Sequence, residues 1–143
     1  ETLNILAEEG SAGFYGGEIA AGIVSTVRNA EGTPGVLSGI DLALYQVIER
    51  EPVCATYRAY EVCGMGPPSS GALTVGQILG MLDGYDLAAM GPEDTNAWRL
   101  IGDASRLAFA DRGRYMADHD FVPMPTQGLV DPSYLSDRGA LLG

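Results

Sequence analysis

The stretch DASRLAFADRGRYMADHDFVPMP, residues 103–125, decides the fold of this chain. Its first half repeats apolar residues every three or four positions, which is the period of an amphipathic helix. Together with the residues before it, this half predicts a long helix from about Thr95 to Met116. The second half carries two prolines, which predict an extended tail after the helix.

Asp111 falls on the apolar side of the predicted long helix. The apolar positions in register with it are Leu100, Ile101, Ala104, Leu107, Ala108 and Tyr115. A buried carboxylate without a partner is strongly destabilising, so Asp111 needs a cation or a hydrogen-bond donor. Arg106, Arg112 and Arg114 are close enough in sequence to reach it. A structural ion pair or a helix-capping contact is the favoured interpretation, and a catalytic acid is the alternative.

Outward from the long helix, periodic patterns and capping residues predict a mostly helical chain. The expected helices cover about residues 1–9, residues 17–29, a short stretch after Ser38 through Leu44, the stretch from Ser69 or Ser70 to Gly84, and the stretch from Asp131 to Leu142. Residues 84–92 are expected to form a loop.

The helix expected after Pro67-Pro68 opens with two serines. Its apolar stripe is predicted to consist of Val75, Ile78, Leu79 and Leu82. Hydroxyl groups and free backbone N–H groups at such a helix start can bind a carboxylate. Capping of the helix by Ser69 or Ser70 is the favoured interpretation.

Residues 46–65 alternate β-branched and aromatic residues, which predicts two strands around a turn at Arg58-Ala59. This turn would place Cys54 opposite Cys63 at a non-hydrogen-bonded position, where Cα atoms approach to about 4.5 Å. Such a pair can form a disulfide, but two small buried thiols remain an equal alternative. A lone hairpin is marginal in water, so either helices must cover it or strands of another chain must extend its sheet.

The composition indicates a folded domain with an acidic surface. The chain has 143 residues, with 19 Asp and Glu against 8 Lys and Arg, which gives a net charge of −11. An acidic surface repels nucleic acid and anionic membranes, so we expect neither as a partner. The chain opens inside one helical pattern and closes inside another, which is typical of a piece of a longer processed protein.

The sequence shows no complete active site. His119, the only histidine, lies between two aspartates, and in an extended segment it would face away from both. We therefore interpret residues 118–120 as a solvated loop rather than a metal site. The chain lacks a GxSxG elbow and a phosphate-binding loop. We predict no catalytic residue, no metal site and no cofactor, and the substrate-binding residues remain unknown.

A series of motifs along the chain resembles the gamma-glutamyltranspeptidase family, whose members include β-lactam side-chain acylases. These motifs are LAEEG (6–10), FYGGEIA (14–20), DLALY (41–45), REPV (50–53), YRAY (57–60), PPSSG (67–71), ILGMLDGYD (78–86), AFADR (108–112) and DFVP (120–123). They occur in the family's order and extend over almost the whole chain.

The resemblance implies an α+β fold, an αββα sandwich of the N-terminal-nucleophile hydrolase type built by two subunits from one self-cleaving precursor. Residues 1–143 would form a single segment, the C-terminal part of the large subunit. The nucleophile would be a threonine at the start of the small subunit. Thr2 cannot be that residue because Glu1 precedes it. The rest of the large subunit would carry the arginine that binds the substrate carboxylate.

The chain departs from the family pattern at several positions. Ala59 replaces the glycine of the usual Tyr-Arg-Gly-Tyr, and alanine would be strained if that position required a positive φ. Other departures are Gly66, Ala72, Asp103 and His119. These differences leave room for an acylase relative instead of a strict transpeptidase.

Three functions follow as hypotheses. The first is a segment of a γ-glutamyl transferase or hydrolase that acts on small-molecule amides, in the periplasm or secreted. The second is a cephalosporin acylase of the glutaryl type from the same family. The third, from another class, is a non-catalytic acidic interaction domain.

Overall fold

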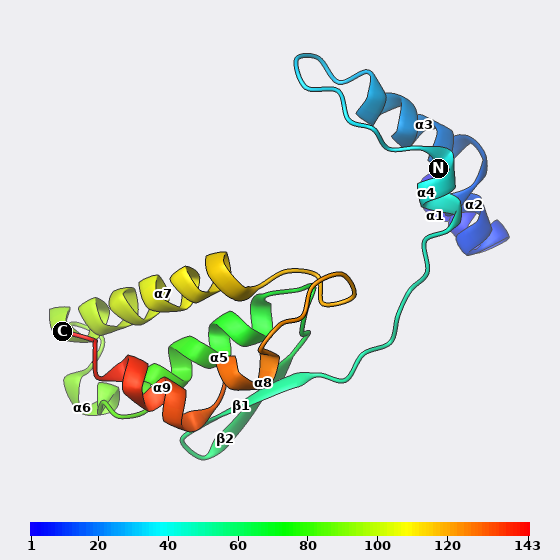
Figure 1. The fold of residues 1–143 in the computed structure, drawn as a ribbon. Helices are drawn as coiled ribbons and strands as arrows, with labels where there is room; N and C mark the ends of the chain where they lie inside the picture. The colour runs from blue at the N-terminus through cyan, green and yellow to red at the C-terminus, as the bar shows by residue number, and fades with distance from the viewer. The chain divides into compact units, whose positions relative to one another are not determined.

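The computed structural model describes all 143 residues as two compact units, Glu1–Glu49 and Arg50–Gly143 (Figure 1). The chain is mostly helical and has one antiparallel two-stranded hairpin, which confirms the predicted composition of the fold. No helix combines the length and the apolar character that a membrane span requires.

The first unit consists of four helices: α1 (Thr2–Glu9), α2 (Ser11–Tyr15), α3 (Gly17–Arg28) and α4 (Gly39–Ala43). The helices predicted at 1–9, at 17–29 and after Ser38 are confirmed. Asp41 accepts hydrogen bonds from the N–H and O–H of Ser38, as the capping spacing predicts. Helix α2 was not predicted, because five residues are too few to establish a helical period.

The second unit is built around α5 (Gly71–Leu82). The hairpin, β1 (Val53–Tyr57) and β2 (Tyr60–Gly64), packs on α5, as do α7 (Thr95–Tyr115) and α9 (Pro132–Gly139). Two short helices, α6 (Leu87–Met90) and α8 (Thr126–Leu129), complete the unit (Figure 1). The helices expected at 70–84, 95–116 and 131–142 are therefore present, although α9 ends at Gly139, before the expected Leu142.

The hairpin has the predicted register, and its cysteines are bonded. Cys54 pairs with Cys63 across the strands, their Cα atoms lie 4.1 Å apart, and the two sulfurs form a disulfide. The alternative of free thiols is thus excluded. The positive φ of the turn falls on Arg58, at 56°, and not on Ala59, so the expected strain at Ala59 is absent.

Three sequence expectations of secondary structure and packing are wrong. The first strand begins at Val53 rather than near residue 46, because Pro52 has no N–H and the preceding apolar residues are exposed. The expected loop at 84–92 contains the helix α6. Asp86 caps the start of this helix by accepting a hydrogen bond from the N–H of Ala89. Val75 is 47% exposed instead of belonging to the buried stripe.

The buried residues of α5 are more polar and have smaller side chains than the sequence predicted. They are Leu73, Thr74, Gly76, Gln77, Met81 and Leu82. Small residues allow close approach: a Cβ at Gly76 would lie 2.9 Å from the Cβ of Ala55 on β1. Since α5 is covered on several sides, its apolar pattern alone did not identify which positions face the neighbours.

The crossing of α5 and α9 depends on two glycines. A Cβ at Gly80 would overlap Cδ1 of Leu135, and a Cβ at Gly139 would lie 2.8 Å from the carbonyl oxygen of Met81. The second contact involves backbone, which cannot move aside as a side chain can. The two helices therefore approach more closely than any larger residue at 139 would permit.

We expect Gly139→Ala to lower the free energy of unfolding by about 1–3 kcal/mol, because the methyl group must displace the backbone of Met81. The matched control is Gly113→Ala on α7, where no atom lies within 4 Å of the added Cβ. That substitution should raise stability by about 0.5–1 kcal/mol through helix propensity. Urea unfolding of the full-length protein measures both, and equal effects of the two substitutions would contradict the close crossing.

Candidate functional site

Asp111 lies at the centre of a buried polar cluster formed by α5, α7 and α9. Its side chain is largely buried, with the residue 6% exposed. Oδ2 accepts from Nε2 of Gln77 at 2.9 Å and from the hydroxyl of Tyr134 at 2.7 Å, and Oδ1 accepts from Arg138 at 2.9 Å. Arg138 also donates to the carbonyl of Leu107. The predicted burial of Asp111 and its pairing with an arginine are both confirmed.

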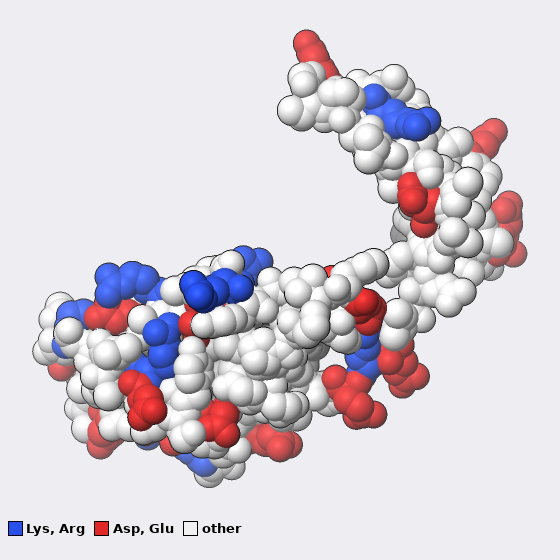
Figure 2. Space-filling view, in the orientation of Figure 1, with Lys and Arg blue, Asp and Glu red and all other residues white.

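The predicted partners of Asp111 are wrong. Arg106 pairs instead with Asp103 at 3.0 Å, and Arg112 donates to Ser70, because both lie on the solvent side of α7. Figure 2 shows the two signs of charge beside one another over this helix. Arg138 comes from α9, 27 residues away in sequence. One feature of the sequence could have indicated these partners. Tyr134 and Arg138 have i, i+4 spacing, which places both on one face of the last helix.

Tyr134 is held in its neutral form within the cluster. Burial, together with the hydrogen bond to Asp111 and its negative charge, raises the pKa of Tyr134 to about 12. A tyrosine beside a carboxylate cannot release its proton without placing two negative charges together. The cluster is therefore a structural tie among the three helices α5, α7 and α9.

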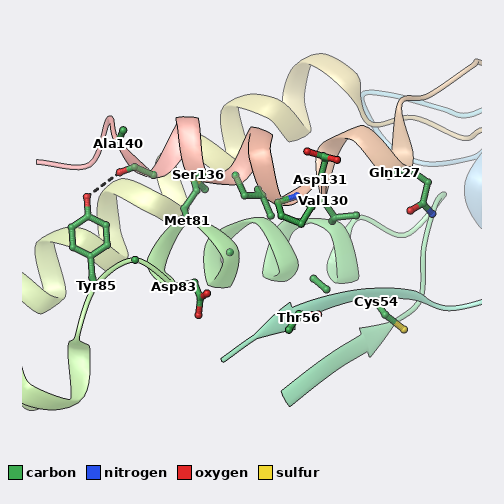
Figure 3. A pocket seen from close by; sticks show the side chains of 16 residues that line it. Cys54, Thr56, Met81, Asp83, Tyr85, Gln127, Val130, Asp131, Ser136 and Ala140 are labelled. Carbon is green, nitrogen blue, oxygen red and sulfur yellow. Dashed lines mark hydrogen bonds between the residues drawn. The ribbon is translucent and has the colours of Figure 1, made fainter. Parts of the chain in front are cut away.

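A groove of about 1040 Å³ lies between β1, the end of α5, and α9 (Figure 3). Its lining includes Cys54 and Thr56 of β1, Met81 of α5, and Ser136 of α9. Two polar groups of its wall, Tyr85 and Asp83, are engaged by the protein itself. Tyr85 donates its hydroxyl to the carbonyl of Gly139, and Asp83 accepts from the N–H of Arg58.

Asp131, on the same wall, caps α9 by accepting from the N–H groups of Ser133 and Tyr134. The Ser133 hydrogen bonds and the Tyr134 N–H hold the pKa of the Asp131 carboxyl below its ordinary value. The sequence prediction that Asp131-Pro132 starts this helix is confirmed. The hydroxyl of Ser133 also donates to the Asp131 carboxylate, so both side chains take part in the helix cap.

Of the two serines predicted as alternative caps of α5, Ser70 does not act as one. Ser70 is the residue that precedes the helix, but its side chain accepts no hydrogen bond from the helix N–H groups. Its Oγ accepts instead from Nε of Arg112 at 2.9 Å, while Ser69 accepts from the N–H of Gly71 at 3.4 Å. Capping by Ser70 is therefore wrong, because Arg112 on α7 competes for its oxygen. Carboxylate binding at this helix start stays an untested prediction.

Residues 118–120 form a turn instead of the expected extended segment. The N–H groups of Phe121 and Val122 both donate to the carbonyl of Asp118, and the turn brings the side chains of Asp118, His119 and Asp120 within 4.8 Å of one another. Arg50 donates to both carboxylate oxygens of Asp120 and lies 2.7 Å from Nε2 of His119. This hydrogen bonding lowers the pKa of Asp120.

Arg50 thus already supplies the positive charge that a metal ion would bring to the acidic turn. The chain's only histidine, which a Ser-His-Asp arrangement would require, is bound in the same turn. The prediction that this chain contributes no catalytic residue, metal ligand or cofactor site remains a prediction.

A family model described as gamma-glutamyltranspeptidase matches residues 1–143. The acylase ACY 1 proenzyme of Pseudomonas sp. strain V22 is 38% identical over 141 residues, which cover 99% of this chain and 25% of that protein. The glutathione hydrolase proenzyme of Escherichia coli strain K12 is 37% identical over 134 residues, which cover 94% of this chain and 23% of that protein.

The crystal structure of Helicobacter pylori gamma-glutamyltranspeptidase matches with a TM-score of 0.84 and 35% identity, over 99% of this chain and 40% of that chain. The chain spans about a quarter of the length of the curated relatives it matches.

We expect Asp111→Ala to cost on the order of 3–5 kcal/mol of unfolding free energy, because Arg138 and Gln77 would lose their shared partner inside the core. Asp111→Asn keeps the shape and removes only the charge, so its cost should be smaller. The matched control is Asp103→Ala on the same helix, whose ion pairs lie near the surface and contribute less than about 1 kcal/mol. A melting temperature unchanged by Asp111→Ala would contradict the role of the cluster.

The raised pKa of Tyr134 predicts a loss of stability at alkaline pH. Its folded value of about 12 lies above the ordinary 10.0, so the folded chain retains a proton that the unfolded chain releases. This contribution is complete below pH 10 and disappears as the pH rises through about 12. Tyr134→Phe should flatten the fall in unfolding free energy over this range. Tyr60→Phe, at a 72% exposed position, should leave the slope as it is.

Proposed function

This chain belongs to the gamma-glutamyltranspeptidase family, and from that membership we propose that it is part of an enzyme that acts on γ-glutamyl amides. The observation that carries the proposal is the family match over the whole chain, residues 1–143. We propose further that these residues form the C-terminal part of the large subunit, in a heterodimer made from one precursor. The names of the relatives as proenzymes support a precursor.

In the proposed enzyme, a threonine at the start of the small subunit is the nucleophile and its own α-amine is the base. The threonine hydroxyl loses its proton to the amine and attacks the carbonyl carbon of the γ-glutamyl amide. The amide C–N bond then breaks, the leaving amine takes up the proton, and an ester links the acyl group to the threonine. A second amine or a water molecule attacks this ester and releases the acyl product.

Within that enzyme, the role of this chain is to build the scaffold rather than to react. Its two-stranded hairpin has a free edge on each strand, and a sheet of this size is marginal unless other strands extend it. The rest of the large subunit and the small subunit are the proposed source of those strands. The Asp111 cluster then holds α5, on which the hairpin rests, in a fixed orientation.

A cephalosporin acylase is the second candidate, and the similarity to the acylase ACY 1 proenzyme favours it. A glutaryl group differs from a γ-glutamyl group only by lacking the α-amino group. The two activities therefore differ in whether the acyl pocket offers a partner to an ammonium group. No residue of this chain is assigned to that pocket.

We propose a periplasmic or secreted location for the protein. The disulfide between Cys54 and Cys63 supports it, because disulfides persist mainly in oxidising compartments. The small-molecule amide is the proposed substrate, and the acidic composition argues against nucleic acid or an anionic membrane as partners.

The test compares two substrates with the full-length mature protein: a γ-glutamyl anilide and the corresponding glutaryl anilide. We expect γ-glutamyl turnover to be the faster if the enzyme is a transferase or hydrolase, and glutaryl turnover to be the faster if it is an acylase. Residues 1–143 alone should cleave neither, since the proposed nucleophile lies on the partner subunit. Cleavage by the isolated segment, or none by the mature protein, would contradict the proposal; the latter would favour an acidic interaction domain.

A further inference from the structure

The groove between β1 and α9 follows one edge of β1. Its lining includes three consecutive residues of that strand, Cys54, Ala55 and Thr56, and no residue of β2 (Figure 3). Because side chains alternate along a strand, a groove that all three residues touch must run along the edge of β1 and not over one face. The other edge of β1 is paired with β2. The groove therefore lies at the edge that has no partner within residues 1–143.

The register of the hairpin determines which backbone groups point into the groove. The Cα atoms of Cys54 and Cys63 lie 4.1 Å apart, which is the short distance of a non-hydrogen-bonded pair. Thr56 and Glu61 form the next pair of this kind. Residues in such pairs direct their N–H and C=O away from the partner strand, so those of Cys54 and Thr56 point to the free edge. No hydrogen bond within residues 1–143 involves these four groups.

An extended backbone is the partner that matches these groups. The N–H and C=O of Cys54 recur at Thr56, two residues or about 6.6 Å further along, and a neighbouring strand has the same repeat. A helix bonds its backbone groups internally and cannot pair with them. The nearest helix, α9, packs mainly on α5. The edge is therefore a template for one more strand.

We propose that the groove holds a third strand of this sheet, an extended segment of the same protein from outside residues 1–143, which pairs with β1 through Cys54 and Thr56. The inference rests on the proposed function, because the proposed enzyme supplies that further chain. The curated relatives have room for such a segment, since this chain covers only 25% of the acylase ACY 1 proenzyme and 23% of the Escherichia coli glutathione hydrolase proenzyme. A second copy does not fit, because the face of its β1 that would turn toward α9 is already covered by its own α5.

The helical wall of the groove specifies the side chains of the third strand. Every second residue of that strand points toward α5 and α9, because side chains alternate. This wall contains the apolar residues Met81, Val130 and Leu135, and the small residues Gly80 and Ala140 leave space beside them. We therefore expect large apolar residues at alternate positions of the third strand. The residues between them turn to the same side of the sheet as the disulfide.

Hydrogen exchange of the full-length mature protein tests the pairing residue by residue. With an open edge, protection alternates: the N–H groups of Ala55 and Tyr57 are bonded to β2, whereas those of Cys54 and Thr56 exchange fast. With a third strand in the groove, we expect all four to exchange at least about 100-fold more slowly than in an unstructured peptide. Fast exchange at Cys54 and Thr56 beside slow exchange at Ala55 would overturn the proposal.

Thr56→Pro removes one outward N–H and places a ring where the third strand would lie. Because the N–H of Thr56 takes no part in the pairing with β2, this change breaks no hydrogen bond within residues 1–143. Proline is tolerated at an open edge but not inside a sheet. We expect Thr56→Pro to lower the melting temperature of the full-length protein, and Thr56→Val, which keeps the N–H, to leave it close to that of the wild type. Equal melting temperatures of the two variants would contradict the third strand.

Two further measurements on the full-length protein separate the possible causes. Protection of Cys54 and Thr56 that is present only at concentrations where two copies associate would assign the edge to a second copy and overturn the proposal. Turnover of the γ-glutamyl and glutaryl anilides is measured in parallel. An active enzyme with an open edge would refute the third strand alone. Protected residues in a protein that cleaves neither substrate would support the third strand and refute only the proposed function.

Discussion

The second unit depends on the hydrogen bonds that the carboxylate of Asp111 accepts. This carboxylate receives three hydrogen bonds from two other helices, so α5, α7 and α9 share one charged centre. A charge at a 6% exposed position is tolerated only if its partners are fixed in place. The carboxylate therefore does more than add stability: it specifies which faces of the three helices meet, since any rotation would leave a buried charge without donors.

The packing around this centre follows from the same constraint. Gly80 and Gly139 let α5 and α9 approach until Tyr134 and Arg138 reach Asp111. One turn before Gly80, Gly76 of α5 admits β1, and Gly64 of β2 lies close to Ala72 of α5. The packing therefore combines small residues on α5 with long polar side chains on its neighbours. The ion pair forms only because the helix backbones lie close together.

The sequence predicted local structure well and long-range partners poorly. Helical periods located α1, α3, α5 and α7, the Asp131-Pro132 pair marked the start of α9, and the turn expected at Arg58-Ala59 predicted the hairpin register. The partner of Asp111 was missed, because sequence proximity favours arginines on the same helix, whereas the helix geometry turns those arginines toward solvent. The same limit applies to Ser70: its position indicated a cap, but only the tertiary structure shows that Arg112 takes its oxygen. Short elements such as α2, α6 and α8 lie below the length at which a period can be recognised.

The contact of Arg50 with the turn at 118–120 has a mechanical consequence. Arg50 lies three residues before β1 and donates to both carboxylate oxygens of Asp120. Pro52 stiffens the short connection between Arg50 and β1. A pull on the chain ahead of Arg50 therefore loads a charged pair first, before any hydrogen bond of the hairpin is stretched. The Arg50–Asp120 pair thus protects the hairpin from this force. Because the pair is partly exposed to water, its strength depends on ionic strength. In high salt the same pull would reach the strand directly, so the force needed to peel β1 away should depend on the electrolyte.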